Sequence, residues 1–431
     1  MTKITCPVYR AAKEIPDQPA IITKGAMVTY RELDVLIQKT MKKLAKNGVM
    51  PGDRVAVTPS NSLKCVVFLL ALWRKKAAAI LSNPNFPKVD CNRIHQDLHL
   101  KKNFDHDATI LLTSGSTGKP KRVVHTFANH YYSALGSNKN FPVKPGDRWL
   151  LSLPLYHVSG LGILFRTFLG GGTVVCVDEK MTPALLKRYK ITHLSMVTTQ
   201  LYRFLKEDLP KKKLPTLKGI LLGGSVIPES LIKKARLSKL PILTTYGLTE
   251  MSSQVVTAGK ILPFRRLKIA NDGEILAKGK TLFRGYIVGK KVVRPLNKEG
   301  WFKTGDLGRW DKKNGFIVLG RKDRMFISGG ENIYPEEIEK ALAGFPSIET
   351  TCVISIPSEE FGARPIGILK LKKKNALNAQ MLNVFLRGRL ARFKIPDKYF
   401  YWPAGLPMSL KYSPLRMKNH FKSNSKKFIE L

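Results

Sequence analysis

The chain is constrained most by a nine-residue segment at 113–121, Thr-Ser-Gly-Ser-Thr-Gly-Lys-Pro-Lys, which directly follows a largely apolar run at 108–112. The apolar run predicts a buried strand, so the polar segment should leave a rigid sheet. Its glycines let backbone N–H groups come close to an anion, and its hydroxyls and lysines can donate to phosphate oxygens. It is not a Walker loop, because Gly115 and Gly118 are too close together and Pro120 interrupts the pattern. The segment predicts a phosphate-binding loop of another type, with an ordinary Ser/Gly surface turn as the alternative.

The pattern of apolar runs predicts an α/β fold. A chain of 431 residues with 43% hydrophobic content can form two or three domains with packed cores. Helical segments separate many of its strand-like runs, which is typical of mostly parallel sheets covered by helices. These runs lie at 53–58, 109–112, 149–153, 173–177, 193–197 and 219–223. A capped helix is predicted over 28–48, and short strands broken by Gly, Asn and Asp predict a β-rich part at about 272–319.

The chain is strongly basic. Its 74 Lys and Arg residues against 31 Asp and Glu give a formal net charge of +43. The basic residues occur in short clusters such as 211–213, 372–374 and 426–427, without a basic helix or a recognisable nucleic-acid module. Such charge runs favour solvated surfaces over a nucleic-acid partner, although a positive field also attracts anionic substrates.

The sequence predicts neither a membrane anchor nor a secreted protein. No apolar run reaches the ~18–20 residues that a membrane span needs. The first residues, Met-Thr-Lys-Ile-Thr, lack the apolar core of a signal peptide. The five cysteines show neither paired nor metal-ligand spacing, and this odd, scattered set favours a reducing, cytoplasmic compartment.

Six further motifs follow the loop in order along the chain. They are Pro-Leu-Tyr-His at 154–157, Gly-Gly-Ser at 223–225, Tyr-Gly-Leu-Thr-Glu at 246–250, Thr-Gly-Asp at 304–306, Gly-Arg-Lys-Asp at 320–323 and a longer run at 328–339. Each is a weak signal alone, but in this order they resemble the motifs of adenylate-forming enzymes, which include acyl- and aryl-CoA synthetases, luciferases and adenylation domains. The resemblance implies a large N-terminal adenylation domain at 1–322, with its β-rich part at 272–319, and a small mobile α+β domain at 323–431.

The chemistry of adenylate formation explains why such residue types are needed. A carboxylate is a poor acylating agent, so its oxygen attacks the α-phosphate of ATP, pyrophosphate leaves, and AMP becomes the later leaving group. This step needs in-line geometry and neutralisation of the phosphate charge by a loop, a metal ion and fixed cations. The resemblance therefore implies ATP and Mg²⁺, with CoA as co-substrate.

The resemblance also assigns the nucleotide site residue by residue. The β- and γ-phosphates would be held by Thr113, Ser114, Gly115, Ser116, Thr117, Gly118, Lys119 and Lys121. Glu250 would bind Mg²⁺, which prefers oxygen ligands, and Thr249 would contact the α-phosphate. Asp306 would accept hydrogen bonds from the ribose hydroxyls, with Arg321 beside it. The adenine would be lined by Gly223, Gly224, Ser225, Tyr246 and Gly247. The alternatives are a solvated loop carboxylate for Glu250 and a turn-forming residue for Asp306.

A second half-reaction accounts for the C-terminal module. After pyrophosphate leaves, the CoA thiol attacks the adenylate carbonyl, and the family rotates its small domain about a hinge that Asp323 matches. The turn that would swing toward the thiol comprises Ser328, Gly329, Gly330 and Glu331, with a simple strand connection as the alternative. His157 would line the carboxylate site and gate the thiol route, with a packed or surface histidine as the alternative.

Segments between the motifs narrow the branch of the superfamily. Residues 125–134, 154–163 with Arg166, and 192–201 resemble the branch that ligates CoA to 2-succinylbenzoate, an aromatic keto-dicarboxylate of menaquinone biosynthesis. The expected partners are small molecules, namely the acid, ATP and CoA, and a homodimer is left open. The alternatives are another aryl- or acyl-CoA ligase, an enzyme that hands its acyl group to a carrier protein, and a weakly active nucleotide-binding homologue.

Two departures from the family pattern bear on activity. Arg122 follows the loop where the family usually has Gly. The family's adenylation lysine lies three residues before an arginine, but here Ser413 holds that position before Arg416, and the nearest lysine is Lys411. The sequence therefore predicts Lys411 as a catalytic cation displaced by two residues.

Overall fold

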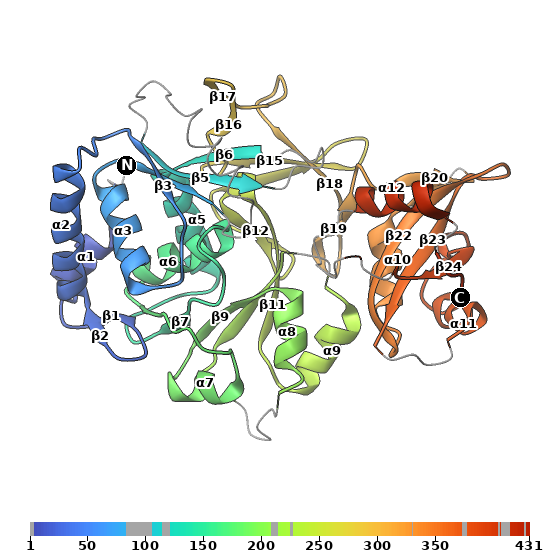
Figure 1. Cartoon of the computed structure of the whole chain (residues 1–431), viewed down its shortest axis with the longest axis horizontal. Helices are drawn as coiled ribbons and strands as arrows, with labels where there is room; N and C mark the ends of the chain where they lie inside the picture. The colour runs from blue at the N-terminus through green and yellow to red at the C-terminus, as the bar shows by residue number, and fades with distance from the viewer. Residues whose placement is uncertain are drawn as a thin grey trace. The chain divides into compact units, whose positions relative to one another are not determined.

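The computed structural model of the protein describes residues 4–82, 106–113, 121–207, 214–224, 227–329, 331–372, 377–403, 406, 414–425 and 428–431. The chain divides into two compact units (Figure 1). The first unit comprises Met1–Gly224, Ser238–Lys268 and Leu276–Lys303, and the second comprises Ser225–Leu237, Ile269–Ile275 and Thr304–Leu431.

The larger sheet of the first unit is parallel in its centre. Its order is β13-β12-β11-β10-β9-β7-β8-β1-β2. The pairs from β11 to β1 are parallel, whereas β12, β13 and β2 run antiparallel to their neighbours. The strands are β1 (Pro19–Ile22), β2 (Met27–Thr29), β7 (Arg148–Leu150), β8 (Thr173–Val175), β9 (His193–Met196), β10 (Gly219–Leu222), β11 (Ile242–Leu248), β12 (Ser253–Thr257) and β13 (Lys260–Ile261). The parallel centre confirms the α/β prediction.

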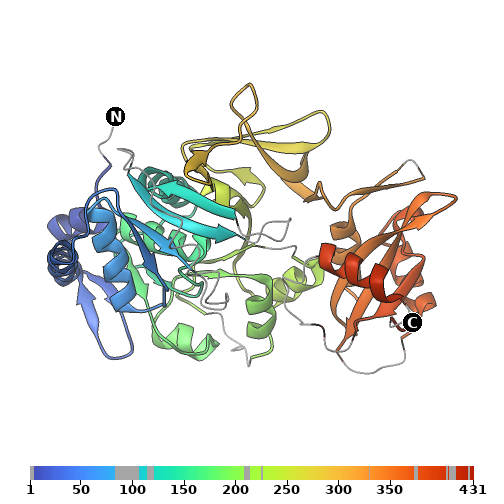
Figure 2. The ribbon, with the colours of Figure 1, turned by 45° about the horizontal axis from the view of Figure 1, so that its top comes forward.

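A second sheet of the first unit carries the ends of the predicted phosphate loop. Its order is β17-β16-β6-β5-β4-β3, with β3, β4 and β5 parallel and the remaining pairs antiparallel. The strands are β3 (Arg54–Val57), β4 (Ala78–Leu81), β5 (Asp107–Thr113), β6 (Lys121–Thr126), β16 (Gly285–Val288) and β17 (Lys291–Val293). Figure 2 shows β5 and β6, in cyan, side by side. Two strands from the predicted β-rich part, β16 and β17, thus join this sheet through pairing with β6.

The described helices of the first unit are α1 (Pro7–Glu14), α2 (Tyr30–Lys46), α3 (Leu63–Arg74), α5 (Phe127–Asn140), α6 (Val158–Leu169), α7 (Pro183–Arg188), α8 (Thr198–Phe204) and the short 3₁₀ helix η1 (Thr249–Met251). Four of these helices, α2, α3, α5 and α7, begin at a side chain that caps them. At the start of α2, the Thr29 hydroxyl accepts from the N–H of Glu32 at 3.2 Å, and the Glu32 carboxylate accepts from the N–H of Thr29 at 2.8 Å. This reciprocal capping box satisfies two otherwise unpaired donors and confirms the helix predicted over 28–48.

Buried aromatic residues fix the base of the strand that leads to the loop. The side chain of Trp73, on α3, is 3% exposed, and its Nε1 donates to the carbonyl of Ala108 at 2.9 Å. Tyr30, on α2, is fully buried and donates to the carbonyl of Gly172 at 2.6 Å. Burial of large apolar side chains stabilises a fold by roughly 1.5–3 kcal/mol each, and the polar tips of these two are satisfied. The start of β5 therefore rests on a rigid core.

Three smaller sheets follow, of which β20-β21 and β22-β23-β24 lie within the second unit. Their orders are β14-β15-β18-β19, β20-β21 and β22-β23-β24. The strands are β14 (Arg265–Ile269), β15 (Glu274–Gly279), β18 (Phe302–Asp311), β19 (Gly315–Arg321), β20 (Phe326–Ser328), β21 (Glu331–Ile333), β22 (Ile348–Ser358), β23 (Gly362–Leu371) and β24 (Lys398–Tyr401). The helices are α9 (Glu229–Leu237), α10 (Pro335–Leu342), α11 (Ala379–Arg387), α12 (Pro414–Asn424) and the 3₁₀ helix η2 (Arg392–Lys394).

The sheet β22-β23-β24 is covered on both faces. Side chains that alternate along a strand point to opposite faces, and the core of the second unit divides accordingly. Val353 and Leu369 pack in one apolar cluster with residues of α10 and α11. Cys352 and Ile368 pack in another with Met417 of α12. The alternation explains why a three-stranded sheet with helices on both sides folds as one α+β module. Among the residues that the structure describes, no helix has the length and apolar character to span a bilayer.

Candidate functional site

The ends of the predicted phosphate loop are held together by a hairpin. Strands β5 and β6 are antiparallel, and their register pairs Thr113 with Lys121. The prediction that a strand leads into the loop is therefore confirmed, whereas the strand that follows the loop, β6, was not predicted. The six loop residues between them that were assigned to phosphate binding, Ser114, Gly115, Ser116, Thr117, Gly118 and Lys119, lie outside the described residues.

Lys121 and Glu250 are brought near one another by a residue that sequence reasoning missed. The Nζ of Lys121 lies 5.2 Å from the centre of the Tyr286 ring. The Tyr286 hydroxyl donates to Oε1 of Glu250 at 2.6 Å. Tyr286 reaches this position because β16 pairs with β6, so that it stands opposite Val123. A hydrogen bond to a carboxylate is charge-assisted and strong, so the predicted metal ligand has a fixed orientation.

The backbone of the Thr249–Glu250 turn, the 3₁₀ helix η1, is anchored from another segment. The N–H of Phe283 donates to the carbonyl of Glu250 at 2.7 Å. The turn ends at Ser252, which has a left-handed conformation with φ of +55°. Such conformations cost energy in residues other than glycine and persist where surrounding contacts impose them.

The predicted adenine-side residues lie at the carboxyl ends of two neighbouring parallel strands. Strand β10 pairs with β11, and Gly223 follows the end of β10 directly. A Cβ on Gly223 would lie 2.6 Å from the carbonyl oxygen of Thr245, and Gly224 has φ of +87°. A Cβ on Gly247 would collide with the carbonyl oxygen of Ser253. Backbone segments thus approach too closely for larger residues, at the edge where open α/β sheets bind ligands. Tyr246 lies on β11 beside them, and Ser225 lies outside the described residues.

His157 precedes α6 and caps its first turn through its backbone. Its carbonyl accepts from the N–H groups of Gly160 at 3.0 Å and Leu161 at 3.2 Å. The imidazole ring is half-buried and lies 4.6 Å from the ring of Tyr156. Its predicted role at the carboxylate site stays a prediction.

In the second unit, Asp306 and Arg321 form the predicted pair. They stand opposite one another in the β18–β19 register, and Nη1 of Arg321 lies 3.1 Å from Oδ1 of Asp306. Arg321 also contacts Asp323 at 3.2 Å through Nε. Burial alone would lower the pKa of Arg321, but its hydrogen bonds and ion pairs with Asp323 and Asp306 outweigh burial and raise the pKa.

Two pairs of ionic contacts, here called clamps, flank the predicted hinge, Asp323, and neither was predicted from the sequence. On one side, Nζ of Lys322 lies 2.6 Å from Oδ2 of Asp272 and 2.9 Å from Oε2 of Glu274. On the other side, Arg324 pairs with carboxylates of α10 at 3.0 Å and 2.6 Å, namely those of Glu336 and Glu339. The residues before and after Asp323 are therefore tied to different elements.

The predicted thiol-side turn is a tight hairpin between β20 and β21. Ser328 pairs with Glu331, and Gly329 has φ of +56°. The N–H of Gly329 donates to the carbonyl of Phe361 at 3.0 Å, and Nη1 of Arg364 donates to the Ser328 hydroxyl at 3.3 Å. Gly330 lies outside the described residues, as does Lys411. Lys418, another cation near the chain end, donates to Ser355 of β22 at 2.7 Å.

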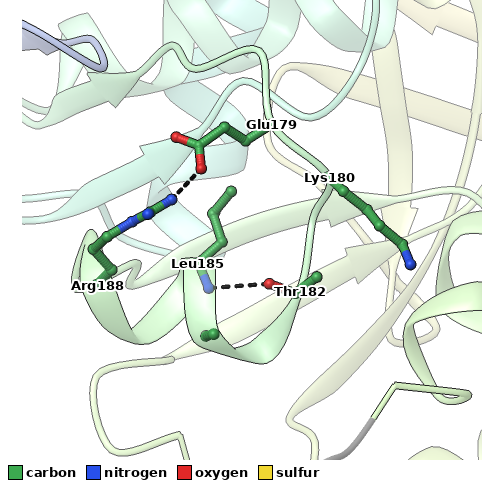
Figure 3. Close-up of a pocket in the computed structure, with 6 residues that line it drawn as sticks. Glu179, Lys180, Thr182, Leu185 and Arg188 are labelled. Carbon is green, nitrogen blue, oxygen red and sulfur yellow. Dashed lines mark hydrogen bonds and ion pairs between the residues drawn. The ribbon is translucent and has the colours of Figure 1, made fainter.

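A surface hollow of about 570 Å³ lies at helix α7 and contains none of the predicted site residues (Figure 3). Glu179 and Arg188 form an ion pair across it, and the Thr182 hydroxyl caps α7 by accepting from the N–H of Leu185 at 3.2 Å. These polar groups satisfy one another, so the chemistry of the motifs belongs elsewhere.

The β5–β6 hairpin, the anchored Thr249–Glu250 turn and the Asp306–Arg321 pair follow the order of the motifs that resemble those of adenylate-forming enzymes. Sequence comparison agrees with the fold. The profile of the AMP-binding enzyme family matches residues 8–104 and 99–287, and that of the AMP-binding enzyme C-terminal domain matches 337–409. The chain belongs to the AMP-binding enzyme family, which confirms the resemblance seen in the motifs.

Several similar relatives and solved structures belong to one branch of this family. The 2-succinylbenzoate–CoA ligase of Haemophilus influenzae is 35% identical over 91% of this chain and 92% of its own length. The o-succinylbenzoate CoA synthetase of Bacillus subtilis, solved with its acyl-adenylate intermediate, is 30% identical with a TM-score of 0.82, covering 93% of this chain and 95% of that one. The same Bacillus enzyme solved with ATP and magnesium ion gives a TM-score of 0.81 at 30% identity, over 92% and 95% of the two chains.

Proposed function

We propose that this protein is an AMP-forming acid–thiol ligase that converts 2-succinylbenzoate into its CoA thioester. ATP first activates the acid as an acyl-adenylate with release of pyrophosphate, and CoA then displaces AMP. The observation that carries the proposal is the identity of about a third with 2-succinylbenzoate–CoA ligases along more than nine-tenths of both chains. The substrate belongs to menaquinone biosynthesis, as the segments at 125–134 and 192–201 predicted.

In the first half-reaction, residues of the first unit would hold the nucleotide phosphates. The carboxylate oxygen attacks the α-phosphorus and the bond to pyrophosphate breaks. Lys121, at the end of the loop hairpin, supplies a fixed positive charge, and Thr249 would contact the α-phosphate. The donor set fits Mg²⁺, because Glu250 offers a carboxylate whose orientation is fixed by the Tyr286 hydroxyl. The bound ion supplies charge that stabilises the phosphates, and Glu250 would hold it.

Asp306 and Arg321 would hold the ribose of the nucleotide. The Asp306 carboxylate would accept hydrogen bonds from the ribose hydroxyls, and Arg321 keeps it in place through the 3.1 Å ion pair. His157 would line the site of the acid. Lys411 would contribute the adenylation cation, and Lys418 is the runner-up, although its amine already donates to Ser355.

In the second half-reaction, the region 323–431 would rotate as a small domain about Asp323. The clamps at Lys322 and Arg324 support this role, because they leave Asp323 as the link between two tied segments. Rotation would bring the Ser328–Glu331 turn toward the thiol of CoA. The domain limits 1–322 and 323–431 follow from this hinge.

The partners of the reaction are small molecules, namely the acid, ATP and CoA. We place the protein in the cytoplasm, in keeping with the odd number and scattered spacing of its cysteines. A homodimer is the assembly to test first, by light scattering coupled to gel filtration.

The deciding experiment offers the purified protein 2-succinylbenzoate, fatty acids and other aromatic acids, each with ATP, Mg²⁺ and CoA. The expected product is 2-succinylbenzoyl-CoA, detected by mass spectrometry, with AMP and pyrophosphate released in equal amounts. A strong preference for a long-chain fatty acid or acetate would overturn the substrate while leaving the class of enzyme intact. Adenylate formation without transfer to free CoA would favour a carrier-protein acceptor. Absence of ATP–pyrophosphate exchange with every acid would favour the weakly active homologue.

A further inference from the structure

A buried chain of hydrogen bonds links helix α5 to the Thr249–Glu250 turn through strand β6. Nε2 of His125 lies 2.7 Å from the carbonyl oxygen of Thr249. On the other side of the ring, Nδ1 faces the hydroxyl of Thr109 at 3.4 Å, and that hydroxyl lies 2.8 Å from Nε2 of His130. The three side chains are 0%, 0% and 2% exposed. The nucleotide chemistry described above assigns them no role.

The Thr249 carbonyl at one end fixes the donor and the acceptor of every hydrogen bond in this series. A carbonyl oxygen can only accept, so His125 must carry its proton on Nε2 and leave Nδ1 as an acceptor. The Thr109 hydroxyl therefore donates to His125, and Nε2 of His130 donates to the Thr109 oxygen. Both nitrogens of His125, the Thr109 hydroxyl and Nε2 of His130 then have partners, which favours a stable polar network in a core.

The two imidazoles are neutral at pH 7. Burial lowers the pKa of His125 to about 4, and burial together with the neighbouring His125 lowers that of His130 well below its ordinary value. A neutral donor can hold the Thr249 carbonyl without placing another positive charge beside a cation site.

We propose that His125 is a positioning residue that holds the Thr249–Glu250 turn in register with the phosphate loop. Strand β6 carries Lys121 at its start and His125 four residues later, so both side chains leave the same face of one rigid strand. The hydrogen bond joins this strand to a turn 124 positions away in the sequence. The proposal rests on the proposed function, because it gives Thr249 and Glu250 their phosphate and metal roles.

The test measures how much Mg²⁺ strengthens ATP binding in the full-length protein, by calorimetry without any acid, so that no turnover occurs. The variant His125→Leu removes the N–H donor and replaces the imidazole with an apolar side chain of moderate size. Changing a partner that orients a metal ligand typically lowers metal affinity by about 10–100-fold. The gain in ATP affinity on adding Mg²⁺ should therefore shrink by about tenfold or more. His125→Gln, which keeps an N–H donor, should retain most of the gain.

A matched control separates positioning from general stability. His193 is also fully buried, and its Nε2 lies 2.9 Å from the backbone carbonyl of Pro142, away from the motif turn. His193→Leu should lower the melting temperature yet leave the Mg²⁺ gain unchanged. If His125→Leu does not fold, Thr109→Val replaces it, because it removes the hydroxyl that orients the His125 ring.

An unchanged Mg²⁺ gain in His125→Leu or Thr109→Val, or an equal loss in His193→Leu, would overturn the positioning role. A wild-type protein whose ATP binding ignores Mg²⁺ would overturn it too, together with the metal role of Glu250. If the wild-type protein shows the Mg²⁺ gain, His125→Leu loses it, and the wild-type protein forms no 2-succinylbenzoyl-CoA, then only the proposed function is refuted.

Discussion

Asp107 offers a sharp test of how the loop-bearing sheet is held together. It begins β5, and its carboxylate joins two arginines, with Oδ2 3.2 Å from Arg54 of β3 and Oδ1 2.6 Å from Arg284 just before β16. The side chain of Asp107 is only 11% exposed. Asp107→Asn keeps the shape but removes the charge, so two poorly solvated guanidinium groups lose the carboxylate that both of them contact.

The expected cost follows from this burial. Removing one partner of a buried ion pair typically costs about 3–5 kcal/mol, because the remaining charge is left uncompensated. The asparagine can still accept one hydrogen bond, so a loss near about 3 kcal/mol is expected. For a unit of roughly 280 residues, that corresponds to a fall of about 5 °C in melting temperature.

Differential scanning calorimetry measures this loss, and Asp17→Asn is the matched control. Asp17 pairs with Arg31 at 3.1 Å, but its side chain is 81% exposed. Exposed ion pairs contribute about 0–1 kcal/mol, so the control should shift the melting temperature by less than about 2 °C. Equal shifts for the two variants would refute the reasoning, because burial would then make no difference to the ion pair.

Acid should destabilise the first unit. Burial lowers the pKa of His125 to about 4 and also lowers the pKa of His193. Below the ordinary histidine pKa of 6.5, the unfolded chain therefore binds more protons than the folded chain. Urea midpoints should fall as pH falls from about 6.5 to about 4; a flat profile would contradict this. Asp323→Pro should slow thioester formation more than adenylate formation, because proline fixes φ at the hinge; equal effects would remove Asp323 as the pivot. Lys411→Ala should lower adenylate formation by about two orders of magnitude and spare thioester formation from supplied adenylate; an unaffected variant would point to Lys418 or another cation.

Local signals in the sequence were sufficient for much of the secondary structure and for the order of the motifs. The capping box of Thr29 and Glu32 operates within three residues, so the start of α2 could be predicted without tertiary information. The pairing of Asp306 with Arg321 was also anticipated, through the family resemblance. The loop at 114–120 and Lys411 lie outside the described residues, and their roles remain predictions.

Contacts between distant segments could not be predicted in this way. Tyr286 and Glu250 are 36 positions apart, and nothing near either residue indicates the other. They meet only because β16 pairs with β6, although the short strands after 272 suggested a β-rich part of their own.

The sequence by itself determined the class of enzyme and many of its strands and helices, and it predicted which residues contact the phosphates. It did so because residue type and spacing express local conformational preference and chemical capacity. Tertiary structure alone decided which groups orient those residues: Tyr286 for the Glu250 carboxylate, and His125 for the Thr249 carbonyl. The physical reason is that a hydrogen bond forms only within about 3 Å, and the order of strands in a sheet sets which distant segments come that close.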